Sequence, residues 1–230
     1  MALSSRLRAI AAFIPPGSRV ADVGTDHGYL PRWLAENGVC TAIIASDVRP
    51  GPLKTAMRNA TLAGLGETID FRLCAGLDAY APDEADTIVI AGMGGETILS
   101  VLSAAPWAKE KTLILQPQTK QPRLRLWLNE NGYAVEDAAL VYDTGRIYVI
   151  WKCTAGEKRE LAAYERYADR TLVIKRDPLL PAYIDSVLKK LLHKRQGLTR
   201  AVSPDPEELR RCNETIDALE KLKEGALCPR

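Results

Sequence analysis

Two acidic residues and two glycines alternate near the start of the chain, in a pattern that suits a small-ligand site. Residues 19–31 read RVADVGTDHGYLP. The apolar positions predict a buried strand that ends at Asp22, and Gly24 and Gly28 predict a turn before a helix that begins at about Tyr29. Amides at the start of such a helix can face a bound ligand. This is the order expected at the nucleotide-site entrance of a doubly wound α/β fold.

The spacing of these glycines differs from that of a dinucleotide-binding fold. The dinucleotide fingerprint is G-x-G-x-x-G, and Asp26 stands where its second glycine should be. A pyrophosphate would meet a carboxylate at that position. A positively charged ligand such as S-adenosylmethionine (SAM), with its sulfonium and amino group, would be attracted by Asp22 and Asp26. The turn therefore favours a SAM-dependent enzyme over an NAD-dependent one.

Another acidic residue stands at the end of the next predicted strand. The run VCTAIIASDV, residues 39–48, carries Asp47 near its carboxyl end, 25 residues after Asp22. In folds of this kind, an acid at that point holds the two ribose hydroxyls of an adenosine. The alternative is that Asp47 caps the helix that starts near Gly51.

Small residues follow the third and fourth predicted strands. The third strand, residues 68–74, leads into Ala75-Gly76-Leu77-Asp78. Leu77 would cover a face of the adenine ring, and Asp78 would either accept a hydrogen bond from its amine or cap a helix. The fourth strand ends in Gly92-Met93-Gly94-Gly95. These glycines leave room for the methyl-bearing end of the cofactor and the substrate, whereas close helix–strand packing would explain one of the three.

The order of the predicted elements indicates the fold class. An amphipathic helix over residues 4–13 precedes five strands that alternate with helices, and the fifth strand ends in Gln116-Pro117-Gln118. Two antiparallel strands joined through Asp143-Thr144-Gly145 follow. We therefore expect an α/β, Rossmann-like, seven-stranded sheet of the class I methyltransferase type over residues 1–155. A dehydrogenase would repeat the βαβ pattern instead.

Residues 156–230 differ in pattern and are expected to form a helical, coiled-coil-like extension. Apart from a possible strand at residues 171–174, they show two heptad-like helical segments separated by residues 203–206. An antiparallel helical hairpin is the simplest assembly. Residues 188–201 carry five basic side chains and no acid. Three roles are open for the hairpin: an RNA-binding arm, a dimerisation arm, or a segment that packs on the sheet. The basic run is either an RNA contact or a solvated helix face.

Composition limits the remaining possibilities. The 230 residues are 47% hydrophobic, which is enough for one substantial core. The net charge of +2 is the sum of −2 for residues 1–150 and +4 for residues 151–230. Five scattered cysteines and two histidines predict neither a disulfide nor a metal site. Because no signal peptide or membrane helix is evident, we expect a cytoplasmic protein, either a monomer or a weak homodimer.

Several motifs together carry a resemblance to a known family. The chain contains D-V-G-T-D-H-G-Y-L-P, A-S-D-V, A-G-L-D, A-G-M-G-G, L-Q-P-Q and G-R-I-Y. Over about residues 4–153 it resembles the bacterial tRNA (adenine-N1)-methyltransferases called TrmK, and the helical tail resembles that family's coiled-coil extension. The resemblance implies SAM as the methyl donor and N1 of adenine 22 in tRNA as the acceptor. It places SAM against ten residues: Asp22, Gly24, Asp26, His27, Asp47, Gly76, Leu77, Ala91, Gly92 and Met93.

Two departures from the family pattern affect individual residues. The family often has asparagine in place of Gln118, so the resemblance supports a polar role for Gln116 more than for Gln118. It often has alanine in place of Gly28, so we expect the glycine at this position to be dispensable.

The implied chemistry needs positioning more than acid–base catalysis. Adenine N1 carries a lone pair, so in-line attack on the sulfonium methyl requires no prior proton removal. Asp26 is the candidate catalytic residue, because its carboxylate would stabilise the positive charge that develops on the base, with His27 and Gln116 as orienting partners. The alternative is that Asp26 only binds the amino group of SAM. Other functions to distinguish are methylation of a small metabolite or another RNA, and non-catalytic RNA binding.

Overall fold

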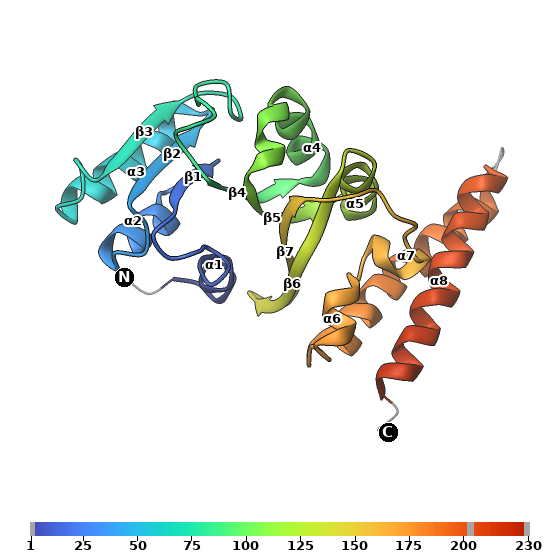
Figure 1. Cartoon of the computed structure of the whole chain (residues 1–230). Coiled ribbons are helices and arrows are strands. Elements are labelled where there is room, and N and C mark those ends of the chain that lie inside the picture. Colours follow the sequence, from blue (N-terminus) through green and yellow to red (C-terminus); the bar gives the residue numbers. More distant parts are fainter. Residues whose placement is uncertain (1–2, 202–204, 228–230) are drawn as a thin grey trace. The chain divides into compact units, whose positions relative to one another are not determined.

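The computed structural model describes residues 3–201 and 205–227 (Figure 1). These residues form two compact units that divide between Lys158 and Arg159. Each unit is built from its own set of elements.

The first unit is built on one seven-stranded sheet with the order β3-β2-β1-β4-β5-β7-β6. The strands are β1 Arg19–Val23, β2 Ala42–Asp47, β3 Ile69–Leu73, β4 Thr87–Gly94, β5 Thr112–Thr119, β6 Tyr133–Asp143 and β7 Arg146–Ala155. The first five run parallel, and β7 pairs antiparallel with both β5 and β6. The expected seven-stranded, Rossmann-like methyltransferase sheet is confirmed.

The helices of this unit occupy the connections between strands. They are α1 Ser5–Ala11, α2 Tyr29–Glu36, α3 Pro50–Leu62, α4 Gly95–Ala104, the 3₁₀ helix η1 Pro106–Glu110 and α5 Gln121–Glu130. The first helix is shorter than the expected residues 4–13, because the Ser4 hydroxyl caps it by accepting a hydrogen bond from Leu7 N at 3.3 Å and its helical hydrogen bonds end at Ala11. It packs against the outer strands β6 and β7.

Strand β4 lies at the centre of the sheet and is covered on both faces. Ile88, Val89 and Ile90 are fully buried, which is typical of a central parallel strand. In register, Asp22 of β1 lies beside Ala45 of β2 and Val89 of β4. The carboxyl ends of β2, β1 and β4 therefore meet at one edge of the sheet.

A two-residue loop joins β6 to β7. Thr144 and Gly145 have φ values of 45° and 79°, so both adopt the left-handed conformation of a type I′ turn. This turn matches the twist of paired strands, which explains how the predicted hairpin closes without a longer connection.

The second unit is entirely helical in the residues described. It contains the 3₁₀ helix η2 Ala163–Arg166, then α6 Arg170–Ile174, α7 Leu180–Arg200 and α8 Pro206–Leu227. Lys194 pairs with Glu208 at 2.7 Å and Lys223 pairs with Asp185 at 2.5 Å, so α7 and α8 run antiparallel. The predicted helical hairpin is confirmed.

The connection within this hairpin lies partly outside the described residues. Residues 202–204, which include the predicted breaker Ser203-Pro204, belong to that part. Asp205 accepts hydrogen bonds from Glu207 N and Glu208 N at 3.0 and 3.1 Å, and so caps α8 as predicted.

The prediction of a possible strand at residues 171–174 is wrong, because this segment belongs to helix α6. Its run of Leu172, Val173 and Ile174 reads as a strand, but the carboxylate of Asp169 accepts a hydrogen bond from Thr171 N at 2.9 Å. This cap fixes the first turn of a helix and overrides the β-propensity of the apolar run.

The composition predicted no membrane helix, no metal site and no disulfide. Among residues 3–201 and 205–227, no helix has the length and apolar character of a membrane span. The same residues contain no group of His, Cys, Asp and Glu side chains that could hold a metal ion. The four cysteines described, Cys40, Cys74, Cys153 and Cys212, are free thiols, and Cys228 lies outside the described residues.

Candidate active site

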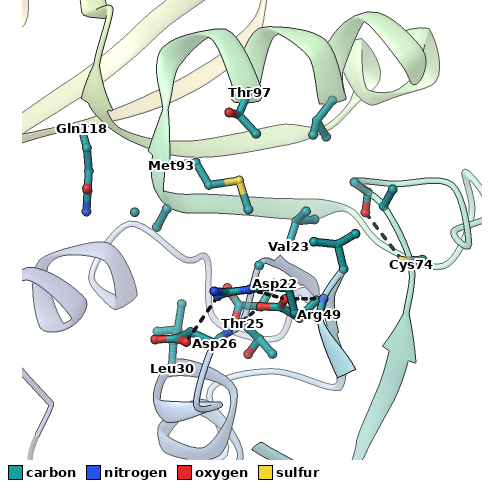
Figure 2. A pocket seen from close by; sticks show the side chains of 18 of the residues that line it. Asp22, Val23, Thr25, Asp26, Leu30, Arg49, Cys74, Met93, Thr97 and Gln118 are labelled. Carbon is teal, nitrogen blue, oxygen red and sulfur yellow. Dashed lines mark hydrogen bonds and ion pairs between the residues drawn. The ribbon is translucent and has the colours of Figure 1, made fainter. Parts of the chain in front are cut away.

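A cavity of about 600 Å³ opens at the carboxyl ends of β1, β2 and β4. Figure 2 shows Asp22, Thr25, Asp26 and Arg49 grouped at one wall, with Met93 on β4 and Thr97 on α4 across from them. Of the ten residues expected to bind the cofactor, eight line this cavity: Asp22, Gly24, Asp26, Asp47, Gly76, Ala91, Gly92 and Met93. The other two, His27 and Leu77, do not.

The turn after β1 brings backbone close to the cavity. Gly24 N and Thr25 N both donate to Ser46 O at 2.8 Å, which ties the turn to β2. Gly24 has φ of +76°, and a Cβ atom there would lie 2.1 Å from Met93 Cε. The backbone conformation therefore favours glycine here, and a larger residue would also displace the flexible end of the Met93 side chain.

Gly28 is also required as glycine, contrary to the expectation that it is dispensable. Its φ is +72°, and a Cβ atom would lie 2.8 Å from Ala56 Cβ and 3.2 Å from Ala56 Cα. The turn packs against α3 at this point, so a larger residue would push the two apart.

Asp47 is buried at the end of β2, with 4% of its surface exposed. One carboxylate oxygen accepts a hydrogen bond from Asp26 N at 3.2 Å, and the other accepts one from Arg49 N at 2.8 Å. Asp47 thus connects the turn after β1 to the start of α3, whose N-cap residue is Arg49. Each oxygen retains acceptor capacity toward the cavity, so organising the loops and binding a hydroxyl pair are compatible roles.

Asp26 and His27 occupy more exposed positions. Asp26 has φ of 54°, and its carboxylate is 60% exposed at the cavity wall. Its oxygens lie 3.8 Å from Arg49 Nη2 and 3.8 Å from His27 Nε2. The His27 carbonyl accepts a hydrogen bond from Asn59 Nδ2 at 3.0 Å, which anchors this residue to α3 and leaves its ring beside the cavity lining.

The carboxyl ends of β4 and β5 form the opposite wall. Gln116 is fully buried, and its Oε1 accepts hydrogen bonds from Gly92 N at 3.1 Å and from Arg6 Nη1 at 2.9 Å. Gln118 is exposed and lines the cavity. Gln116 therefore organises the wall, and Gln118, for which the resemblance gave less support, is the amide that borders the open space.

The glycines at the end of β4 and the start of α4 serve two purposes. Gly92 has φ of +76° and lines the cavity, as expected for a ligand site. A Cβ atom on Gly95 would lie 2.7 Å from Thr119 O and 2.8 Å from Lys120 O, so close packing of α4 against the end of β5 explains this glycine. Room for a ligand therefore explains Gly92, and close helix–strand packing explains Gly95.

Some cavity residues had no local signal in the sequence. Arg6 comes from α1 and reaches Gln116, which is 110 positions away. Arg49 and Thr97 also line the cavity. Arg49 is the N-cap residue of α3, and Thr97 lies in the first turn of α4. Ligands of open α/β sheets bind beside the helices that follow the parallel strands, so this rule could have predicted both residues.

Burial changes the acidity of Asp22. The side chain is 5% exposed, and burial raises its pKa from 3.8 to about 6, with a further rise from the neighbouring Asp47 carboxylate. Between these two pH values, the folded chain binds more protons at this position than the unfolded chain does. The free energy of unfolding contributed by Asp22 therefore falls as pH rises from about 4 to about 6.

We expect an Asp22→Asn variant to lack this pH dependence. Relative to the variant, the wild type should lose about 2 kcal/mol of unfolding free energy between pH 4 and pH 7. This is most of the value of a shift of about two pKa units, because the unfolded carboxyl is already about half ionised at pH 4. Urea unfolding of both proteins at half-unit pH steps measures the difference. Parallel stability curves for the two proteins would show that the pKa of Asp22 is not raised.

Comparisons with known proteins point to one family. A methyltransferase domain model matches residues 3–151. The tRNA (adenine(22)-N(1))-methyltransferase of Bacillus subtilis is 37% identical over 166 residues, which cover 71% of this chain and 68% of that protein.

Solved structures agree with this match over almost the whole chain. The B. subtilis tRNA methyltransferase TrmK superimposes with a TM-score of 0.85 at 28% identity, covering 96% of this chain and 99% of that one. The Streptococcus pneumoniae protein Sp1610, solved in complex with S-adenosyl-L-methionine, gives a TM-score of 0.80 at 30% identity, covering 96% and 100%.

Proposed function

The chain belongs to the family of tRNA (adenine(22)-N1)-methyltransferases, and we propose that it is a SAM-dependent enzyme that methylates N1 of adenine 22 in tRNA. The observation that carries this proposal is the cavity at the carboxyl edge of the sheet, with a buried carboxylate at the end of β2 and glycines at the ends of β1 and β4. This is the ligand position of open α/β sheets.

The residues at the cavity fit SAM. Asp47 supplies a buried acceptor for the ribose hydroxyls, and Asp22 supplies a carboxylate for the positively charged methionine end. Gly24, Gly76 and Gly92 have positive φ and keep the walls free of side chains. When bound, SAM supplies a methyl group on a positively charged sulfur. The chain's own task is to hold the acceptor nitrogen in line with that methyl and to exclude water.

Of the ten residues carried over from the family, we propose the eight that line the cavity as direct SAM contacts. His27 and Leu77 do not line the cavity and would support the site without contacting SAM directly. His27 lies 3.8 Å from the Asp26 carboxylate, and Leu77 is buried beneath the corner that Gly76 forms. For these two residues we therefore propose supporting roles in place of the expected direct contacts with SAM.

Asp26 remains the proposed catalytic residue. Its carboxylate borders the cavity, where it would stabilise the positive charge that methylation places on adenine. Arg49 Nη2 lies 3.8 Å from an Asp26 oxygen and offsets part of the negative charge of the carboxylate. If Asp26 acts on the base as well as contacting SAM, an Asp26→Asn variant loses kcat at saturating SAM by a larger factor than it raises the Kd for SAM. A carboxylate that only binds the amino group of SAM would instead raise the Kd and leave kcat at saturating SAM unchanged.

We further propose a division of labour between residues 1–155 and residues 156–230. The first segment holds the cofactor cavity and would carry catalysis. The second carries a net charge of +3 and would contact the tRNA backbone through the basic run on α7. We propose that the protein acts in the cytoplasm, where tRNA is modified, as a monomer or weak homodimer.

Exposed lysines on α7 allow this role to be tested. Lys189 and Lys190 are exposed, while Lys194 pairs with Glu208 at 2.7 Å and is less available. Reversing both charges, Lys189→Glu with Lys190→Glu, should weaken tRNA binding about tenfold or more and reduce the slope of log Kd against log salt by roughly two. Filter binding at several salt concentrations measures both quantities.

Lys221→Glu is the matched control, because Lys221 is also exposed but stands on α8 between Glu220 and Glu224. It should change tRNA affinity by less than about twofold, since acids already offset its charge. Equal effects of the α7 and α8 variants would show that only total charge matters. No effect of either would remove the hairpin from the tRNA interface.

Methyl transfer tests the function itself. Labelled SAM is incubated with unmodified tRNA, and the products are digested to nucleosides and analysed by mass spectrometry. We expect 1-methyladenosine, and none from a tRNA that carries guanine at position 22. SAM binding without transfer to tRNA would redirect the search to a small metabolite or another RNA, and RNA binding without SAM binding would indicate a non-catalytic protein.

A further inference from the structure

Arg6 is a cation at the cavity that no acid neutralises in the part of the chain that is described. Two arginines line the cavity, Arg6 and Arg49. Arg49 lies 3.8 Å from an Asp26 oxygen and 3.6 Å from an Asp47 oxygen, so its charge is balanced. Arg6 has no ion pair with a described carboxylate and is half-buried. A half-buried cation without a partner costs desolvation energy, which an anionic ligand would offset.

The guanidinium of Arg6 is held in place by two groups. Its Nη1 donates to Gln116 Oε1 at 2.9 Å, and its Cζ lies 5.8 Å from the centre of the Tyr148 ring. The same Gln116 oxygen accepts from Gly92 N at 3.1 Å, so Arg6 and the end of β4 share one buried anchor. A Cβ atom on Gly92 would lie 3.6 Å from Arg6 Nη1. The cation is therefore fixed beside the carboxyl end of β4.

The strand order sets the distance between Arg6 and Asp47. β1 lies between β2 and β4, so the end of β2 and the end of β4 are about 10 Å apart, at about 4.8 Å for each strand spacing. In SAM, seven covalent bonds connect the ribose C3′ to the carboxylate carbon, a span of about 9 Å when extended. If the ribose binds Asp47, the carboxylate reaches the end of β4.

We propose that Arg6 binds the carboxylate of the methionine end of SAM, and that Gln116 positions it. This inference rests on the proposed function, because it assumes that SAM occupies the cavity. The cation completes the site, since Asp22 and Asp47 suit the cationic and hydroxyl groups of SAM and leave its carboxylate without a partner. The N-terminal helix α1 is thus a component of the cofactor site.

Decarboxylated SAM provides a direct test, because it retains the adenosine, sulfonium and amino group and lacks only the carboxylate. Calorimetry without tRNA gives the Kd of each ligand for the wild type, Arg6→Ala and Arg6→Gln. The second variant keeps an amide donor for Gln116 but removes the charge, so it distinguishes loss of the ion pair from collapse of the wall. Arg8→Ala is the matched control, because Arg8 is an exposed arginine of the same helix.

We expect the wild type and Arg8→Ala to bind SAM about tenfold to a hundredfold more tightly than decarboxylated SAM. Both Arg6 variants should bind the two ligands about equally, with wild-type affinity for decarboxylated SAM. A full preference for SAM in the Arg6 variants would overturn the proposal, and a simultaneous loss of tRNA affinity would assign Arg6 to an RNA phosphate. Equal weakening of both ligands would make its role structural. A wild type with the expected preference that methylates no tRNA would contradict the proposed function while supporting the role of Arg6.

Discussion

Replacing Asp47 with alanine should raise the Kd for SAM by about a hundredfold. The loss includes up to two charge-assisted hydrogen bonds to the ribose hydroxyls, each of which contributes about 1.5–3 kcal/mol when buried. It also includes the hydrogen bonds from Asp26 N and Arg49 N that hold the neighbouring loops in position. Calorimetric titration of the purified variant with SAM measures the change, while thermal unfolding checks that the sheet remains intact.

Two comparison variants isolate the carboxylate of Asp47. Asp47→Asn retains size and one acceptor oxygen, so its Kd should lie between those of the wild type and the alanine variant. Asp78 was one candidate partner for the adenine amine, but it is exposed and does not line the cavity, so Asp78→Ala should bind SAM normally. A Kd for Asp47→Ala within about twofold of the wild-type value would remove Asp47 from the ribose site.

Replacing Gly95 with alanine should lower the free energy of unfolding by about 3 kcal/mol. The new methyl group would overlap Thr119 O and Lys120 O, at 2.7 and 2.8 Å, and both are backbone atoms that cannot rotate away. Relief requires α4 to move from the end of β5, which costs packing energy around the buried Gly95. Urea unfolding followed by circular dichroism measures this loss.

Ser103→Ala provides the matched control for Gly95→Ala. Ser103 is exposed on the same helix, so the alanine meets no backbone atom and helix propensity changes only slightly. Its free energy of unfolding should stay within about 0.5 kcal/mol of wild type. Similar effects of the two substitutions would mean that α4 can shift freely and that Gly95 is not a packing requirement.

The cavity was largely predictable because topology alone brings its residues together. Asp22, Asp47 and Gly92 each lie at or near the carboxyl end of a parallel strand, and the carboxyl ends of such strands share one edge of the sheet. Their position along the sequence therefore fixed their position in space. No side-chain geometry had to be known, and the seven strands with their final antiparallel pair followed from the same pattern of elements.

Residues beside these positions were harder to place. Leu77 immediately follows Gly76, whose φ of 53° turns the chain so that the leucine is buried outside the cavity lining. His27 follows Asp26, whose φ of 54° likewise redirects the backbone. Sequence patterns locate a turn but do not specify which side each side chain takes. The assignment of Gly28 as dispensable was wrong for the related reason that its neighbour, Ala56, is distant in sequence.

Arg6 illustrates the limit of local reasoning. Its amphipathic helix was predictable, but its partners Gln116 and Tyr148 come from strands far along the chain. The helix α6 shows the opposite case, since a single local cap at Asp169 decided the structure of an apolar run that resembles a strand. Long-range contacts and short-range hydrogen bonds can each override a propensity pattern.

The docking of α1 on β6 and β7 also has a consequence for biosynthesis. This helix leaves the ribosome before every strand of its unit, yet the strands that cover it are the last two of that unit. About 140 residues must be translated in between, which takes roughly 7 to 30 s at typical bacterial rates. During this interval, Ile10 and Ala11 lack their final apolar neighbours. The nascent chain therefore cannot assemble the wall formed by Arg6, Gln116 and Tyr148 until β7 has emerged.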